Sequence, residues 1–248
     1  MTWAAHRGEA GLEIELDRAN QQLDALYYSL SHDLYSPMRT MQEMARILLE
    51  DHPQQLPPET EVFLKHVVQG TARLSARMEG LARFGRVSRQ PLSFRRVDVE
   101  ALVRQLLFDL DNKAETGHKP VVTSELPDAN GDAEMLQQVF STLISNAIKF
   151  SRGVAEPSIE IGGRSEGGWN AYFVADNGVG FDMKYAGKLF GLFQRMHAEA
   201  QFDGAGVGLA IARCIVERHG GTMRAEAAKD RGATIHFTLP AALAPPGG

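Results

Sequence analysis

The feature that most constrains this fold is a pair of amphipathic helical patterns separated by a proline-rich break. Between residues 12 and 51 the apolar residues recur at steps of three and four, a spacing typical of a coiled-coil seam with a stutter near Leu30. Residues 51–58 hold three prolines, which cannot continue a helix. A second pattern then runs from Pro58 to Gly85, with glycine as the expected C-terminal cap. The seam positions are Leu16, Ala19, Leu23, Leu26, Leu30, Leu34, Pro37, Met41, Met44 and Leu48 in the first pattern, and Phe63, Val67, Gly70, Leu74, Met78 and Leu81 in the second.

Two long helices joined by a short connection predict an antiparallel hairpin. One hairpin cannot bury both of its apolar stripes by itself. We therefore expect it to pair with a second copy as a four-helix bundle, which makes the protein a homodimer.

His32 lies within the first helical pattern. At about 100° per residue its imidazole faces away from Leu30 and Leu34, and hence toward solvent. Asp33 follows directly, and Pro37 interrupts the backbone ladder about one turn later, which usually bends a helix. A single histidine on a helix is also typical of an ordinary solvated surface, so the downstream sequence decides between the two interpretations.

The segment Ser31-His32-Asp33-Leu34, followed by Pro37-Met38, resembles the phospho-acceptor box of sensor histidine kinases. The common form of that box has an arginine where this chain has Tyr35. The resemblance implies that His32 accepts a phosphoryl group and that Asp33 holds its ring.

Composition excludes several classes of function. The chain has 248 residues and a formal net charge of −5, which does not favour a nucleic-acid partner. No run of apolar residues is long enough for a membrane span, and the N-terminus lacks an apolar signal core, so we expect a cytoplasmic protein. Cys214 is the only cysteine and lies in an apolar helical run, which favours a buried, inert thiol.

The pattern changes after the hairpin to mixed helix and strand. We expect residues 1–86 to form the helical domain, 87–93 a linker, 94–241 an α+β sandwich domain and 242–248 a disordered tail. Within the sandwich domain the patterns predict helices near residues 99–110, 132–151 and 207–219, and strands near 94–99, 119–126, 158–161, 170–175, 222–227 and 233–239.

Three stretches of the second domain carry residues suited to nucleotide chemistry. Asn146 and Lys149 lie one turn apart on one helix face, where an amide oxygen suits Mg²⁺ and an ammonium suits phosphate. Asp176 ends an apolar strand before a turn that contains Gly178 and Gly180, and its carboxylate can accept a hydrogen bond from an adenine amino group. Each stretch alone is equally typical of a polar helix face or a tight turn.

The third stretch contains Gly204, Gly206 and Gly208 at the start of a helix, whose free N–H groups and dipole suit phosphate oxygens. No strand immediately precedes it, and the lysine of a P-loop is absent, so neither of those nucleotide folds is indicated.

Taken in order, these stretches resemble the N, G1 and G2 boxes of the histidine kinase ATP-binding domain, whose superfamily includes Hsp90, gyrase B and MutL. Residues 190–195 resemble the F box, and residues 183–203 would form the mobile lid; parts of the chain are most similar to bacteriophytochrome-type kinases. The resemblance implies nucleotide contacts from Asn146, Lys149, Phe150, Asp176, Gly178, Gly180, Arg195, Gly204, Gly206 and Gly208, with Asn146 as the magnesium ligand. Thr142 departs from the asparagine that many relatives carry one turn before Asn146.

The resemblance implies a protein-histidine kinase that uses ATP and Mg²⁺ to phosphorylate His32. The phosphoryl group would then pass to an aspartate of a response regulator, and an upstream sensory domain or protein would control the enzyme. Ser36 lies four residues after His32, where some relatives have a residue that assists dephosphorylation of the regulator. Tyr35 and Thr142 keep open a catalytically weak dimeric adaptor, and a chaperone-like ATPase is a further alternative.

Overall fold

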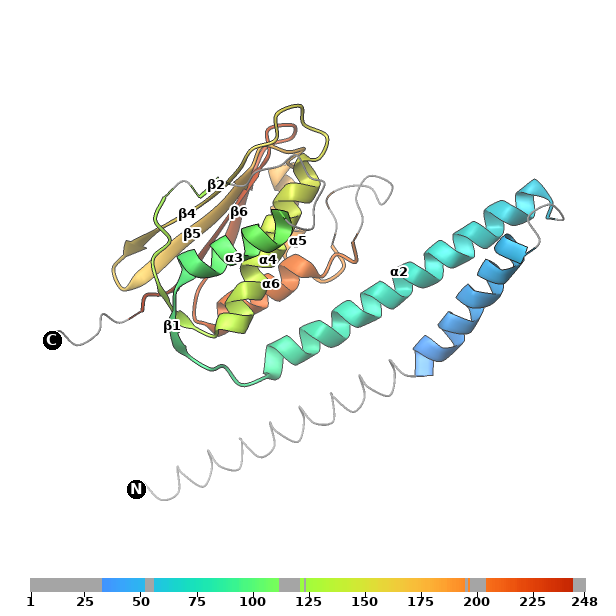
Figure 1. Ribbon diagram of the computed structural model, residues 1–248, viewed down its shortest axis with the longest axis horizontal. Helices are drawn as coiled ribbons and strands as arrows, with labels where there is room; N and C mark the ends of the chain where they lie inside the picture. The colour runs from blue at the N-terminus through green and yellow to red at the C-terminus, as the bar shows by residue number, and fades with distance from the viewer. Residues whose placement is uncertain are drawn as a thin grey trace, which may run out of the picture. The chain divides into compact units, whose positions relative to one another are not determined.

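The first unit is an antiparallel helical hairpin, as the sequence predicts. The protein is described here by a computed structural model that covers residues 33–51, 56–111, 121–122, 124–194, 196 and 204–242. Residues 33–51 form one helix and α2 (Pro58–Arg89) lies beside it, in blue and cyan in Figure 1. Met38 and Ala45 are buried, and the Tyr35 hydroxyl donates a hydrogen bond of 3.3 Å to the Ser75 carbonyl oxygen of α2.

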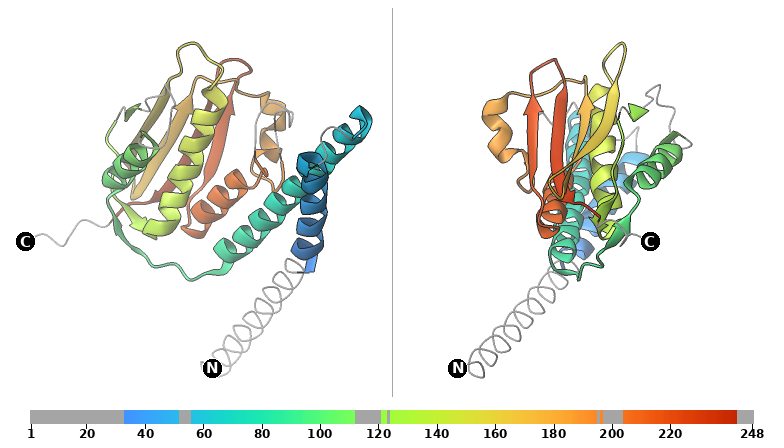
Figure 2. Two further views of the ribbon diagram at one scale, coloured as in Figure 1. Left: turned by 45° about the vertical axis from the view of Figure 1, so that its right-hand side comes forward. Right: turned by 90° about the vertical axis from the view of Figure 1, so that its left-hand side faces the viewer.

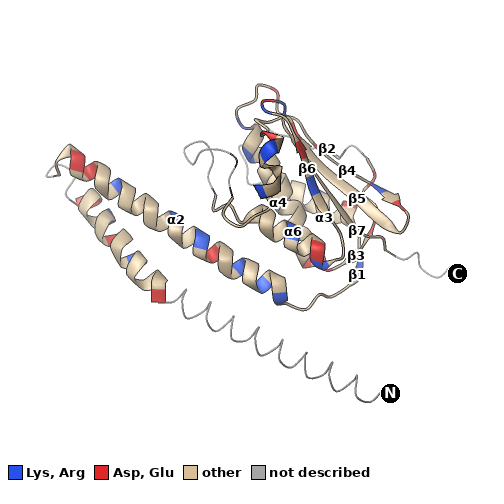
Figure 3. Ribbon diagram, turned by 180° about the vertical axis from the view of Figure 1, so that it is seen from behind, with Lys and Arg blue, Asp and Glu red and all other residues tan. Residues whose placement is uncertain are grey.

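Much of the predicted seam stays uncovered on this hairpin. Met44 is 62% exposed and Phe63 is 68% exposed, and Leu34, Met41, Leu48, Val67 and Leu74 are exposed as well. Charged residues of both signs alternate with these positions along α2 (Figure 3). The hairpin therefore keeps an apolar stripe that its own two helices do not bury.

The predicted end of α2 at Gly85 is wrong. The helix continues to Arg89, and Gly85 is buried inside it. Glycine in a helix interior costs only about 1 kcal/mol, and no proline follows until after the helix ends. Arg86 and Arg89 stand in the last turn, where cations suit the negative end of the helix dipole.

The second unit, residues 90–248, is an α/β sandwich. A five-stranded sheet has the order β2-β4-β5-β7-β6, and only the β2–β4 pair is parallel. The helices α3, α4 and α6 cover one face of this sheet (Figure 2). The elements are β1 (Arg95–Val97), α3 (Val99–Asp111), β2 (Val121–Val122), β3 (Ala129–Gly131), α4 (Ala133–Ser151), β4 (Ile159–Glu166), β5 (Trp169–Asp176), the 3₁₀ helix η1 (Met183–Tyr185), α5 (Ala186–Leu189), α6 (Gly208–Arg218), β6 (Met223–Ala227) and β7 (Ala233–Pro240).

Helix α4 forms the centre of the core. Its predicted apolar face is fully confirmed, since Met135, Leu136, Val139, Phe140, Leu143, Ile144 and Ile148 are all buried. The Phe140 ring packs edge-on against Tyr172 of β5 and Phe237 of β7, at centroid distances of 5.7 and 5.2 Å. Full burial of one such side chain contributes about 1.5–3 kcal/mol, so this face fixes α4 on the sheet.

The Asp132 side chain caps α4 by accepting hydrogen bonds from the backbone N–H groups of Glu134 and Met135. The sequence patterns missed β3, whose three residues Ala-Asn-Gly have low strand propensity and form a strand only because β1 pairs with them. Among the described residues of the strand predicted over 119–126, Val121–Val122 form β2 and residues 124–126 are not strand.

Several predicted positions lie outside the described residues. These are residues 12–32 of the first helical pattern, which include His32 and the seam positions from Leu16 to Leu30, together with Arg195, most of the C-terminal half of the predicted lid and residues 243–248 of the predicted tail. None of the helices within the described part of the chain is both long and apolar enough to cross a membrane.

Candidate active site

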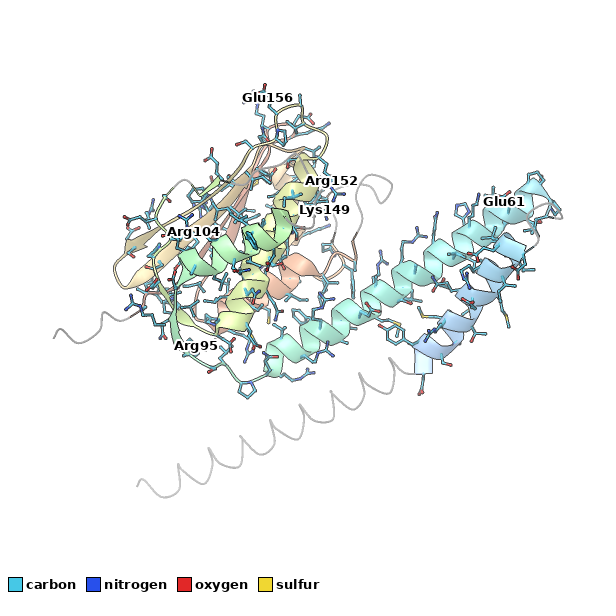
Figure 4. All side chains as sticks on the ribbon, viewed as in Figure 1. Glu61, Arg95, Arg104, Lys149, Arg152 and Glu156 are labelled. Carbon is cyan, nitrogen blue, oxygen red and sulfur yellow. The ribbon has the colours of Figure 1, made fainter. Side chains whose placement is uncertain are left out.

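Three of the predicted site residues lie at the C-terminal end of α4. Asn146 and Lys149 are half-buried on one face of the helix, and Phe150 follows them. Figure 4 shows Lys149 at this end of α4, with Arg152 beyond it. The Lys149 ammonium lies 4.3 Å from the centroid of the Phe150 ring. One helix turn therefore presents an amide, a cation and an aromatic ring side by side.

Asp176 ends β5, where the strand leaves the core. Its carboxylate accepts a 2.9 Å hydrogen bond from the Gly178 N–H and another from the backbone of Ala233. Burial outweighs these two hydrogen bonds and raises the pKa of Asp176 to about 6. A mostly buried carboxylate with accepting capacity left is well suited to a ligand that donates a hydrogen bond.

The turn after Asp176 is held against the end of α4. The Val179 N–H donates a 3.2 Å hydrogen bond to the Phe150 carbonyl oxygen. A side chain at Gly178 would collide with that same carbonyl, so only glycine allows this close approach. The contact brings the carboxylate of β5 and the polar face of α4 to one place, although they are far apart in the sequence.

The third predicted stretch closes the same site from α6. The position of a Cβ atom on Gly204 would be 3.7 Å from the Lys149 ammonium nitrogen. Gly206 has a φ of +71°, and its carbonyl oxygen accepts a 2.8 Å hydrogen bond from the Phe193 N–H. Helix α6 begins at Gly208, and the preceding Val207 provides no side-chain cap. The first N–H groups of α6 are thus left for a ligand rather than a cap.

Thr142 and Gly208 form the contact between α4 and α6 at this site. A Cβ atom on Gly208 would lie 3.1 Å from the Thr142 methyl carbon. Thr142, which stands where many relatives have an asparagine, therefore packs directly on the start of α6. The Thr142 methyl group leaves little room for any side chain at Gly208.

Sequence reasoning missed the contribution of residues 228–233. Gly232 has a φ of +85°, and a side chain there would strike the Asp176 backbone carbonyl. The Asp230 N–H also donates a 2.8 Å hydrogen bond to the Val179 carbonyl oxygen. The Asp-Arg-Gly run is a turn signal, but only the β5–β7 pairing shows that this turn supports Asp176.

The acceptor segment is described only from Asp33 onward. Asp33 and Ser36 are both exposed on the helix over residues 33–51. Among the residues that the structure describes, no group of three or more His, Cys, Asp or Glu side chains could hold a metal ion.

A carboxylate, an ammonium and an uncapped helix start around glycine loops on an α/β sandwich define a nucleotide-binding ATPase domain. Residues 131–243 match the family model described as histidine kinase-, DNA gyrase B- and HSP90-like ATPase. Cyanobacterial phytochromes B and A of a Nostoc species are 35% and 33% identical to this chain over 93% of its length. The chain spans 31% and 30% of those two proteins, respectively.

Among solved structures, full-length ShkA in complex with AMPPNP superposes with a TM-score of 0.62 and 26% identity, over 88% of this chain and 46% of ShkA. The histidine kinase AdeS of Acinetobacter baumannii shares the fold, with a TM-score of 0.60 and 19% identity over 85% of this chain and 98% of that one. The chain corresponds to the helical hairpin and ATPase domain of sensor histidine kinases.

Proposed function

We propose that this protein uses Mg·ATP to phosphorylate His32 and passes the phosphoryl group to an aspartate of a response regulator. The observation that carries the proposal is the convergence of Asp176, Lys149 and the start of α6 beside Phe150. The AMPPNP bound to ShkA supports an ATP-type ligand for this domain.

The roles of the individual groups follow from their chemistry. The Asp176 carboxylate accepts a hydrogen bond from the adenine amino group, while Lys149 and the N–H groups at Gly208 contact phosphate oxygens. Gly178, Gly180, Gly204 and Gly206 let the backbone approach the nucleotide, and Arg195 adds a phosphate contact from the lid. Asn146 would hold Mg²⁺, which supplies neutralisation of the phosphate charge.

Neutral imidazole is already a nucleophile near pH 7, because its ordinary pKa is about 6.5. Asp33 accepts a hydrogen bond from the one N–H of the neutral His32 ring, which leaves the other ring nitrogen free to attack the γ-phosphorus. His32 belongs to residues 1–89 and the nucleotide residues to the second unit, so the transfer requires the two units to meet. Pro37 provides a bend point for that movement.

Dimerisation through the hairpin is part of the proposal. The exposed seam residues, among them Met44 and Phe63, form the apolar stripe that a second copy would cover. The partners are then a second copy, a response regulator and the sensory domain or protein that supplies the signal.

The direct test is incubation with γ-labelled ATP and Mg²⁺ for the parent chain, His32→Ala and Asp176→Asn. Acid-labile, alkali-stable label on the parent alone is the expected result. The Asp176→Asn variant is the matched control at an ATP concentration near the parent's dissociation constant, since it keeps the acceptor histidine and weakens only nucleotide binding. Binding of nucleotide without label on the parent would contradict the proposal and favour the dimeric adaptor, whereas ATP hydrolysis without protein label would favour the chaperone-like ATPase.

Ser36 provides a second activity to test, because its exposed hydroxyl lies one helical turn from residue 32 and can orient water. We expect Ser36→Ala to slow dephosphorylation of the regulator while autophosphorylation persists. Thr40→Ala is the control, since its hydroxyl already donates to the Ser36 carbonyl oxygen. Equal dephosphorylation by the Ser36→Ala variant and the parent would remove this role.

A further inference from the structure

The two helices that form the nucleotide site also meet at their other ends. The site lies at the C-terminal end of α4 and the N-terminal end of α6. Helix α4 has 19 residues and is therefore about 28 Å long. Figure 4 shows Lys149 near one end of α4 and Arg95 of β1 near the other. The His219 side chain joins the remote ends of α4 and α6.

His219 follows the last residue of α6 and is only 3% exposed. Its Nε2 atom accepts a 3.0 Å hydrogen bond from the backbone N–H of Asp132, the N-cap of α4. Its Nδ1 atom lies 2.7 Å from the Ile215 carbonyl oxygen and must donate to it. The two bonds together require a neutral ring with its proton on Nδ1.

Residues 90–94 also contact this junction between the start of α4 and the end of α6. The Ser93 N–H donates a 3.0 Å hydrogen bond to the Asp132 carboxylate, and the Arg218 guanidinium donates one of 2.6 Å to the Gln90 carbonyl oxygen. The Phe94 ring packs against the His219 ring with centroids 5.3 Å apart. Gln90 directly follows the last residue of α2, so this segment is the covalent route from the hairpin to the second unit.

We propose that His219 is a positioning residue that fastens residues 90–94 to both helices of the nucleotide site and so couples α2 to that site. The expected effect on autophosphorylation rests on the proposed kinase function, whereas the attachment of residues 90–94 to the two helices does not depend on it. Protonation at Nε2 would place a donor against the Asp132 N–H and break the attachment. Burial lowers the pKa of His219 despite the nearby Asp132 carboxylate, and Arg218 lowers it further, so the ring is held neutral.

The test uses the full chain with three substitutions of His219. His219→Gln is long enough to place an amide oxygen near the position of Nε2, as an acceptor for the Asp132 N–H. The shorter His219→Asn places its amide only near the position of Nδ1, where it can donate to Ile215, and His219→Leu keeps neither bond. Ser93→Pro removes the Ser93 N–H without touching either helix, and His236→Gln on β7 is the matched histidine control. For each variant, amide hydrogen exchange at residues 90–97, the ADP dissociation constant and the autophosphorylation rate are measured.

We expect His219→Asn, His219→Leu and Ser93→Pro to speed exchange at residues 90–97 and to slow autophosphorylation up to about tenfold, the upper size of one lost hydrogen bond. The ADP dissociation constant should stay within about twofold, and His219→Gln should restore part of the rate. Unchanged exchange at residues 90–97, or uniformly faster exchange with weakened ADP binding, would overturn the proposal. If the parent does not autophosphorylate, the proposed function fails, and hydrogen exchange still decides whether His219 fastens the segment.

Discussion

At the scale of single residues, Asp176 shows the conflict between binding and stability. Its carboxylate is mostly buried, and the hydrogen bonds from Gly178 and Ala233 do not offset the loss of solvation, so its pKa rises to about 6. The unfolded chain has the ordinary value of 3.8. The folded state therefore binds the proton more tightly, and the free energy of unfolding falls as the pH rises from about 4 to 6. Above pH 6, in the absence of nucleotide, the buried charge lowers the free energy of unfolding by its full amount.

We therefore expect Asp176→Asn to stabilise the protein in the absence of nucleotide. At pH 7.5 the gain should be on the order of 1–3 kcal/mol, and it should shrink at pH 5, where the parent carboxyl is largely protonated. Urea unfolding at both pH values measures the difference. Asp182→Asn is the control, because the Lys184 ammonium lowers the pKa of Asp182 and its removal brings no gain. A loss of stability for Asp176→Asn at pH 7.5 would show that the charge on Asp176 does not destabilise the folded protein.

The same carboxyl predicts a pH dependence of nucleotide binding. A charged acceptor is stronger than a neutral one, so the ADP dissociation constant of the parent should rise as the pH falls through about 6. Asp176→Asn should bind ADP about 10- to 100-fold more weakly at pH 7.5, the range expected for one hydrogen bond to a charged group. Calorimetry of both proteins separates the effect of Asp176 protonation from that of the ADP phosphates, because the phosphates titrate identically with either protein. Parallel pH profiles for the two proteins would contradict the assignment.

At the scale of elements, the approach of α6 to α4 depends on the pair Gly208 and Thr142. We expect Gly208→Ala to weaken ADP binding several-fold, because its methyl group would lie 3.1 Å from the Thr142 methyl carbon and move the start of α6 outward. Thr142→Ser in the same chain removes that methyl group, keeps the hydroxyl and should restore affinity. The four dissociation constants form a double-mutant cycle. Additive effects of the two substitutions would show that the helix spacing does not control binding.

The sequence predicts the elements well where a pattern is long. The buried face of α4 and its boundary at Asp132 follow from helical periodicity alone, because seven apolar positions agree. Short elements and turns are set by their partners instead: β3 exists through its pairing with β1, and the Asp230–Gly232 turn supports Asp176 through β7. No sequence pattern reports a close approach such as that of Gly178 to the Phe150 carbonyl.

At the scale of the whole molecule, the proposed function assigns the two units complementary halves of one reaction. The hairpin contributes the acceptor sequence and an uncovered apolar stripe, and the second unit contributes a site that needs no residue from the hairpin to assemble. This division explains why the family signal is spread along the chain: residues 31–38 are suited to phosphotransfer and residues 146–208 to nucleotide binding. The joining segment, residues 90–94, is the part that must transmit position between them.

The apolar stripe leads to a prediction about assembly. Met44 is 62% exposed on the hairpin, so Met44→Asp should place a charge in the interface of a dimer and shift the protein toward monomer. Arg46→Ala is the matched control, because Arg46 pairs with Glu43 and Glu50 on the charged face of the same helix. Sedimentation over a range of concentrations should show a dimer for the parent and the control and a monomer for Met44→Asp. The second unit should still bind ADP in that monomer, because the residues of its proposed nucleotide site all belong to that unit. A monomeric parent, or a Met44→Asp variant that remains fully dimeric, would show that this stripe does not hold two copies together.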